Sequence, residues 1–169
     1  MQIINYIKSG SVPITIIISF FAALVFTVNC GKPASDGEST NNSGFVFTDT
    51  WITKVSDTSE ISAAYFKVEN ETESDDLFLG ATSKVAEFIE IHEMLQDKDV
   101  TGMRMLDQVE VKANNSIQFT PGGLHLMLIG LTSPVKKGDS ITLILNFKKA
   151  GPLKVNFTVK APHEYYEED

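Results

Sequence analysis

Residues 124–159 read LHLMLIGLTSPVKKGDSITLILNFKKAGPLKVNFTV, and this stretch decides the fold class. Leucine, β-branched and aromatic residues gather in three short runs, and Gly, Pro, Asp and Lys occupy the segments between them. This alternation is typical of short strands joined by turns. The same pattern reaches back to Phe45, and no stretch shows a long period of 3.6 residues. About eight or nine such strands predict an all-β domain, a β-sandwich or small barrel.

A different composition precedes this domain. Residues 14–28 read ITIIISFFAALVFTV and carry no charge, and only one basic residue, Lys8, comes before them. A membrane-spanning helix needs about 20 apolar residues, so the shorter run fits the apolar region of a secretory signal better. We therefore expect residues 1–29 to be a signal peptide. Because residues 9–31 are all uncharged, an uncleaved N-terminal anchor is the alternative.

Cys30, the only cysteine in the chain, follows the apolar run. A cysteine in this place resembles a bacterial lipoprotein signal, in which the cysteine becomes the mature N-terminus and carries the lipid. Residues 27–29 read TVN and depart from the usual lipobox, which has Leu three places before the cysteine and Gly or Ala just before it. The pattern predicts lipidation of Cys30 and a membrane-anchored, extracytoplasmic protein, with an ordinary cleaved signal as the other possibility.

The rest of the chain divides into three parts. Residues 31–44 read GKPASDGESTNNSG and hold no large apolar side chain, so we expect the lipidated cysteine and these residues, 30–44, to form a flexible tether. The β domain is expected over residues 45–162, and residues 163–169 form an acidic tail. The chain has 22 acidic and 14 basic residues and a net charge of −8, which argues against a nucleic-acid partner.

Histidine and methionine occur together in three of the predicted strands. Side chains two positions apart share one face of a strand, so Leu124, Leu126 and Leu128 can fill the core while the residues between them point away. Taken one at a time, such methionines usually pack in a core, but packing gives no reason for histidine to accompany them. Each of the three strands presents two such donors on one face: His92 with Met94, Met103 with Met105, and His125 with Met127.

This donor set favours one metal ion. A thioether sulfur is soft and neutral, so it is a poor ligand for magnesium, calcium or zinc and a good one for Cu(I), and imidazole suits copper as well. A site of two methionines and two histidines would hold Cu(I) without thiols, which oxidise outside the cytoplasm.

At these residues the sequence resembles the periplasmic copper chaperone family PCuAC. The family motif is His, ten residues, Met, twenty-one residues, His, one residue and Met, and His92, Met103, His125 and Met127 match it at every position. The segments GMRM, PGGLHLMLIGL, VKKGDSITLILNF and KKAGPLKVNFTV also look like family segments.

The resemblance implies a cupredoxin-like Greek-key β-sandwich that binds one Cu(I) near its surface through His92, Met103, His125 and Met127. It implies a carrier and not an enzyme, one that delivers copper to partner proteins such as the dinuclear copper centre of cytochrome c oxidase or another copper chaperone. Met94 and Met105 would be outer-shell or transient donors.

Three other readings are weaker. A blue-copper protein needs a thiolate ligand, and the only cysteine lies ahead of the tether. A Ser-His-acid hydrolase would lack a GxSxG turn. A metal-free surface interaction or adhesion lipoprotein with a β-sandwich domain has no reason to keep four donors at the family spacing, and it is the alternative function.

Overall fold

The computed structural model describes residues 40–97 and 100–161. In this part of the chain every regular element is a strand, as the sequence predicted, and no helix there is long and apolar enough to cross a membrane. The strands are β1 (Thr40–Asn42), β2 (Phe45–Thr53), β3 (Ile61–Asn70), β4 (Asp76–Thr82), β5 (Ala86–Asp97), β6 (Val100–Leu106), β7 (Val109–Val111), β8 (Asn115–Phe119), β9 (Leu124–Leu131), β10 (Ser140–Phe147) and β11 (Gly151–Lys160).

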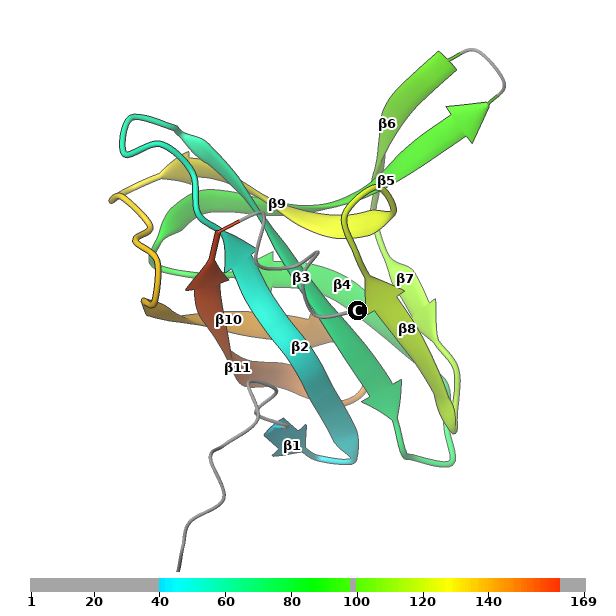
Figure 1. Ribbon diagram of the computed structural model, residues 1–169. Helices are drawn as coiled ribbons and strands as arrows, with labels where there is room; N and C mark the ends of the chain where they lie inside the picture. The colour runs from blue at the N-terminus through cyan, green and yellow to red at the C-terminus, as the bar shows by residue number, and fades with distance from the viewer. Residues whose placement is uncertain (1–39, 98–99, 162–169) are drawn as a thin grey trace, which may run out of the picture. The chain divides into compact units, whose positions relative to one another are not determined.

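The strands form one hydrogen-bonded sheet that folds back on itself into two layers (Figure 1). Its order is β6-β5-β9-β3-β2-β11-β10-β4-β7, with β1 paired to β2 and β8 paired to β3. Neighbouring strands are antiparallel except β11 and β2, which pair in parallel over residues 158–160 and 51–53. This short parallel contact joins the layer of β5, β9, β3 and β2 to the layer of β11, β10 and β4.

Phenylalanine rings from both layers meet in the core. Phe66 of β3 stacks on Phe119 of β8, with ring centroids 4.2 Å apart, and meets Phe157 of β11 edge-on at 5.7 Å. Phe78 of β4 contacts Phe119 at 5.6 Å and Phe147 of β10 at 5.3 Å. All five side chains are buried, so the strand-by-strand alternation seen in the sequence produces one apolar interior.

One irregularity in β2 changes which side chains face outward. Between the Thr48–Lys67 and Trp51–Tyr65 pairs, β2 contains one residue more than β3. Asp49 lies in this β-bulge with a φ of 51°, a left-handed conformation that asparagine and aspartate adopt more readily than other non-glycine residues. The extra residue moves Trp51 from the core face to the outer face of the sheet.

The hairpin of β5 and β6 extends beyond the rest of the sheet. The last residue of β5 that pairs with β9 is Glu93, so residues 94–97 pair with β6 alone. In Figure 1 this hairpin rises from the body of the domain.

The structure refines the domain boundaries expected from the sequence. β1 lies within residues 30–44, which were expected to form the tether, and pairs with residues 45–47, so the folded part reaches back to Thr40.

Residues 108–119, QVEVKANNSIQF, contain two strands, β7 and β8, which are separated by a turn in which Asn114 has a φ of 53°. Cys30, the signal peptide expected over residues 1–29 and the acidic tail expected over residues 163–169 lie outside the described residues.

The bulge gives a stability prediction. We expect Asp49→Val to lower the free energy of unfolding by about 1–2 kcal/mol, because a β-branched residue is strained in the left-handed conformation. Asp49→Gly should remain close to the parent protein, because glycine adopts this conformation without strain. Urea unfolding followed by the fluorescence of Trp51, the only tryptophan, measures both. Equal stability of the two variants would contradict the bulge.

Candidate metal centre

Three strands bring the histidines and methionines together on one face of the sheet. His92, in β5, lies directly opposite His125 of β9 on one side and opposite Met105 of β6 on the other. Directly paired residues of antiparallel strands point to the same face, so these three side chains share a row across the sheet. The adjacent rows hold Met94 opposite Met103 and Glu90 opposite Met127.

The opposite face of the same strands belongs to the core. Leu126 and Leu128 of β9 and Ile91 of β5 are buried, and Leu124 packs against them. The prediction that the leucines of β9 face inward is therefore confirmed. We call the side that carries His92 and His125 the outer face.

The hydrogen-bond pattern sets how close the donors are. The backbone N–H of Met94 donates to Gly123 O at 3.2 Å, on the β9 side of β5, so Met94 makes no backbone hydrogen bond to Met103. Because bonding sides alternate along a strand, His92 and Met105 form the same kind of pair. In such pairs the Cα atoms are about 4.5 Å apart, closer than in hydrogen-bonded pairs, which brings the side chains of β5 and β6 into contact range.

The two imidazole rings are held by different nitrogen atoms. Nε2 of His92 lies 2.8 Å from Oε2 of Glu90, and Nδ1 of His125 lies 3.0 Å from the backbone oxygen of Gly123. Nδ1 of His92 is buried and has no hydrogen-bond partner among the described residues. A buried nitrogen without a partner costs free energy, and such atoms in native structures call for an explanation.

Two aromatic rings lie beside His125 on the outer face. The ring centroid of His125 lies 6.3 Å from that of Tyr65 in β3, and the Tyr65 centroid lies 4.5 Å from that of the buried Trp51 of β2, with the rings of both pairs tilted. Trp51 reaches the outer face only because of the bulge at Asp49. This row of rings on paired strands favours a fixed position of the imidazole.

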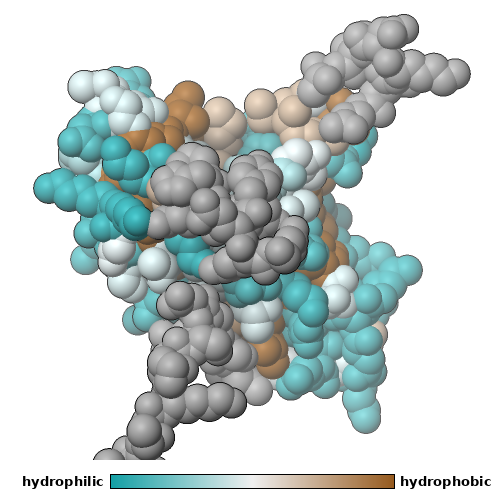
Figure 2. Space-filling model, in the orientation of Figure 1, coloured by the Kyte–Doolittle hydropathy of each residue, from teal (hydrophilic) through white to brown (hydrophobic). Residues whose placement is uncertain are grey.

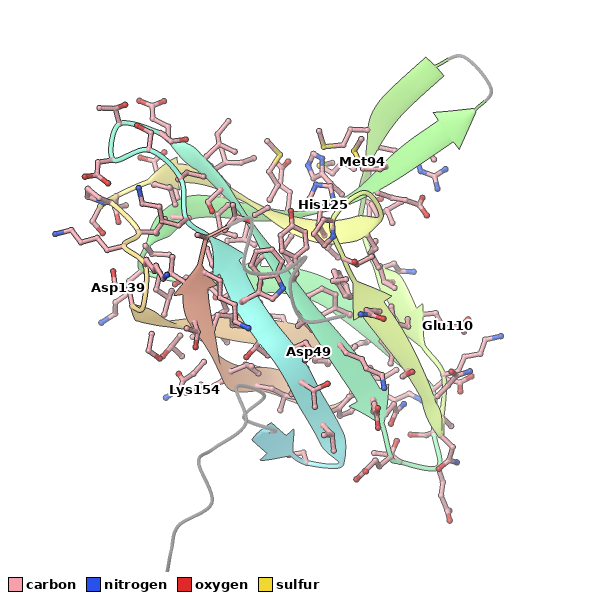
Figure 3. All side chains as sticks on the ribbon, viewed as in Figure 1. Asp49, Met94, Glu110, His125, Asp139 and Lys154 are labelled. Carbon is pink, nitrogen blue, oxygen red and sulfur yellow. The ribbon has the colours of Figure 1, made fainter. Side chains whose placement is uncertain are left out.

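The outer-face residues His92, Met94, Met103, Met105, His125 and Met127 are called the donor cluster. The exposed fraction of these residues rises from β9 to β6. His125 is 9% exposed, whereas Met103 and Met105 are 52% and 56% exposed. Figure 3 shows Met94 and His125 near the point where the β5–β6 hairpin leaves the body of the domain. The histidines are thus anchored, and two of the thioethers face solvent.

The geometry of the rings suits a shared metal ion. The centroids of His92 and His125 are 5.9 Å apart. Two imidazoles that bind one ion through nitrogens about 2 Å from it place their centroids about 5–6 Å apart. Within the described residues, no three His, Cys, Asp or Glu side chains gather as a metal site. The soft donors in the same and adjacent rows are the thioethers of the methionines.

An apolar row adjoins the donors on the outer face. Ile129 of β9 lies opposite Ile61 of β3 and Phe88 of β5, and Phe88 is 62% exposed. Figure 2 shows hydrophobic surface on this side of the domain. A contiguous apolar patch next to a polar site is typical of protein–protein contact surfaces.

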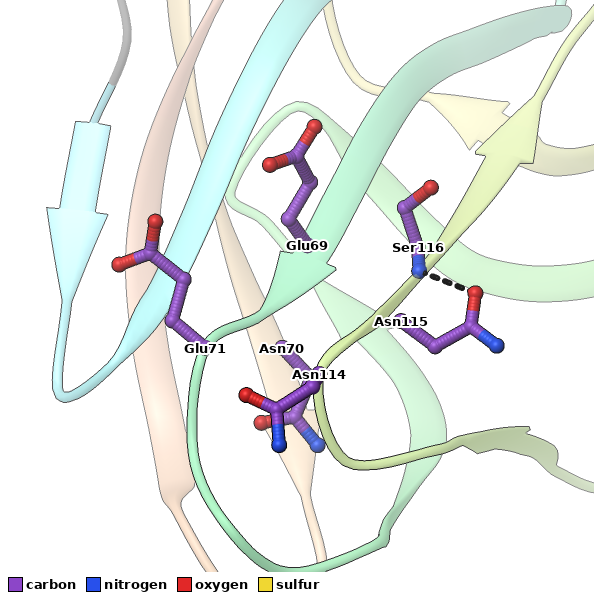
Figure 4. A pocket seen from close by; sticks show the side chains of 6 residues that line it. All are labelled: Glu69, Asn70, Glu71, Asn114, Asn115 and Ser116. Atoms are coloured by element: carbon purple, nitrogen blue, oxygen red, sulfur yellow. Dashed lines mark hydrogen bonds between the residues drawn. The ribbon is translucent and has the colours of Figure 1, made fainter.

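A hollow lies away from these residues, at the end of β3 and the start of β8 (Figure 4). Several of its polar groups take part in local hydrogen bonds: Asn70 Nδ2 donates to the backbone oxygens of Ser74 and Val111, and the backbone N–H of Ser116 donates to Asn115 Oδ1. Its lining holds no histidine or methionine.

All four residues of the spacing motif lie on the outer face, and the sequence reasoning missed three residues beside them. Glu90 shares the face by its even spacing from His92, a signal that the sequence carried. Trp51 could not be found in the same way, because the bulge reverses the alternation of β2. Tyr65 faces outward by the regular alternation of β3, but its place beside His125 depends on the pairing of β3 with β9, which spacing does not reveal.

Comparison with known proteins gives a family match and a fold match. The family model described as "Putative lipoprotein LpqE-like" matches residues 45–159. A relative called "Putative lipoprotein Lxx21020", from Leifsonia xyli subsp. xyli, is 29% identical over 103 residues, which cover 60% of this chain and 62% of the relative. The chain thus spans less than two thirds of that relative's length.

Two solved structures share the fold. A copper-bound PCuAC domain from PmoF2 superimposes with a TM-score of 0.63 at 18% identity, covering 73% of this chain and 98% of that domain. The solution structure of CuI-DR1885 from Deinococcus radiodurans gives a TM-score of 0.54 at 21% identity, covering 74% and 82%. The predicted cupredoxin-like β-sandwich is confirmed.

The pairing of β5 with β6 can be tested by cross-linking. In a Cys30→Ser background, which removes the only native thiol, Met94→Cys with Met103→Cys should form a disulfide on mild oxidation. The close, directly opposed pair meets the Cα spacing that a disulfide requires.

Met94→Cys with Arg104→Cys is the matched control. Arg104 pairs with Glu93 and so points to the opposite face, and these two thiols should stay free. Intact-mass measurement and thiol counting give the result. A disulfide in the control and none in the test pair would mean that the register is shifted by one residue.

Proposed function

The chain belongs to the LpqE-like family, which confirms its resemblance to the PCuAC type, and on this basis we propose that it is an extracytoplasmic copper chaperone. The observation that carries the proposal is the pair of imidazoles 5.9 Å apart, with methionines in the same and the adjacent rows of one outer face. Methionines that only pack in a hydrophobic core would be buried, whereas the side chains of Met103 and Met105 are exposed.

The cargo is one Cu(I) ion, bound by His92, Met103, His125 and Met127. Two thioethers favour a soft monovalent ion, and because they carry no charge they compensate a divalent cation poorly. Met105 lies in the row of the two histidines, and Met94 lies opposite Met103 in the next row along the hairpin. Both serve as outer or transient donors. Two structural neighbours, described as a "Copper-bound PCuAC domain" and as "CuI-DR1885", agree with copper as the ion, and the second agrees with its monovalent state.

The site is built for transfer and not for catalysis. A carrier must give up its ion by direct contact, and exposed thioethers beside an apolar row allow a partner to approach and exchange ligands. We propose that the partner is a copper-accepting protein, either the copper-site subunit of cytochrome c oxidase or a further chaperone. No enzymatic step is assigned to the site.

We further propose that Cys30 carries a lipid and that the protein works on the outer side of a bacterial membrane. The isolated cysteine after an apolar run supports this, and the matched family and the Leifsonia relative are both described as lipoproteins. A lipid and tether would keep the copper site close to membrane-bound acceptors, raising its effective concentration there.

Met127→Leu tests the ligand set. The change keeps volume and apolarity, so it should cost less than about 1.5 kcal/mol of stability. Loss of a ligand should weaken Cu(I) binding by more than about tenfold, the lower end of what outer-shell changes cause. Competition with a Cu(I) chelator in the Cys30→Ser background measures affinity, because an unmodified thiol would itself bind Cu(I). His125→Ala should also lose affinity.

Arg104→Ala is the control, because Arg104 lies between two methionines in the chain but faces the other side of the sheet. It should bind one Cu(I) as the parent does. If Met127→Leu and His125→Ala both bind as tightly as the parent, the four-ligand assignment is wrong.

The anchor is tested separately. Cys30→Ser should abolish incorporation of radiolabelled fatty acid and leave the protein either released from the membrane or unprocessed. A parent protein that never takes up the label contradicts the lipoprotein assignment, whereas the copper assignment does not depend on it.

A further inference from the structure

Glu90 stands out because its carboxylate faces the donor cluster and yet is a hard ligand, unsuited to Cu(I). Its Oε2 contacts Nε2 of His92 at 2.8 Å, and both side chains lie on the outer face. An ionised carboxylate can only accept hydrogen bonds, so the nitrogen that faces it must carry the proton. Glu90 therefore fixes one tautomer of His92, with the proton on Nε2.

The consequence falls on the other nitrogen of the ring. In the neutral ring, Nδ1 of His92 is then a bare lone pair, and this is the buried atom that has no hydrogen-bond partner among the described residues. A lone pair without a proton is the form in which histidine binds a metal. Binding of a metal ion by Nδ1 of His92 would explain why this buried atom has no hydrogen-bond partner among the described residues.

His125 is arranged the opposite way. The backbone oxygen of Gly123 accepts from Nδ1 at 3.0 Å, which places the proton on Nδ1 and leaves Nε2 bare. The two rings, whose centroids are 5.9 Å apart, thus carry their bare lone pairs on different nitrogens.

We propose, on the basis of the copper-binding function proposed above, that Glu90 is a positioning residue that makes His92 bind copper through Nδ1 while His125 binds through Nε2. Partners that hold the second nitrogen of a metal-binding histidine orient the ring and raise its basicity, and their loss typically costs about 10–100-fold in metal affinity. Glu90 acts through His92 and does not itself bind the ion.

The matched control is Glu93, three residues away on the opposite face. Its Oε2 accepts from Nη2 of Arg104 at 2.6 Å, so removing it changes an acidic side chain of the same strand without touching the donor cluster. Glu90→Leu removes the acceptor beside His92, whereas Glu90→Gln keeps a carbonyl oxygen that can accept the same hydrogen bond.

The experiment uses ¹⁵N-labelled protein with Cys30→Ser and reads the imidazole nitrogens by long-range ¹H–¹⁵N correlation, without metal and with Cu(I). Without metal, His92 should be protonated on Nε2 and His125 on Nδ1. Cu(I) should then move the resonances of His92 Nδ1 and His125 Nε2, while those of His163 stay in place.

Competition with a Cu(I) chelator measures the Cu(I) affinity of the parent and of each variant. Glu90→Leu should lose the fixed tautomer of His92 and about 10–100-fold in Cu(I) affinity, Glu90→Gln should recover much of both, and Glu93→Leu should match the parent. If metal-free His92 is protonated on Nδ1, or if Glu90→Leu binds like Glu93→Leu, the positioning inference is wrong. If the tautomers are as inferred but Cu(I) moves neither histidine, the proposed copper function fails instead.

Discussion

The pairing register of β5 with its two neighbours is the constraint on which the site depends. His92 stands opposite His125 and Met105 only because β5 pairs with β9 and β6 in this register. A slip of one residue would turn every donor of a strand to the other face and expose Ile91 in its place. The buried leucines of β9 oppose such a slip, because burying apolar surface is the largest favourable term in folding. The packing of the core thus holds the donors together on the outside.

The β-bulge in β2 is a second feature that shapes the site, through side chains of β2 and β3 on the same outer face. The bulge at Asp49 adds one residue to β2, so Trp51 leaves the core face and packs on Tyr65, which in turn lies against His125. β-Bulges often occur next to functional sites, where they redirect a side chain. Here the redirected side chain packs beside Tyr65, the neighbour of a proposed ligand, and the burial of the indole ring offsets the cost of the left-handed aspartate.

The faces of the strands could be predicted from the sequence because side chains alternate with a period of two. That rule placed Leu126 and Leu128 in the core and His125 and Met127 outside it. The rule does not say which residues stand opposite each other, since register depends on pairing between distant segments. The row of His92, His125 and Met105 therefore appears only in the structure.

The part played by Glu90 was also beyond the sequence. Even spacing puts Glu90 on the face of His92, but exposed acidic residues usually serve solvation, and nothing in the spacing indicates that this carboxylate meets Nε2. The choice of nitrogen follows from a 2.8 Å contact, and the other nitrogen, Nδ1, is buried without a hydrogen-bond partner among the described residues. Both are properties of the folded arrangement and not of composition.

The gradient of exposure across the cluster suits a protein that must both hold and release an ion. On the β9 side, His125 is buried, braced by Tyr65 and hydrogen-bonded to Gly123. On the β6 side, Met103 and Met105 lie on a hairpin whose far end pairs with no third strand. A partner that approaches from solvent therefore meets the thioethers first. Their sulfur atoms need no proton on release, and long unbranched side chains can swing without disturbing the sheet. On the proposed function, replacement of the ligands of Cu(I) by those of a partner would begin at the methionine sulfurs and end at the histidine nitrogens. The histidines would then set the affinity for the ion, and the exposed methionines would set the route of its transfer.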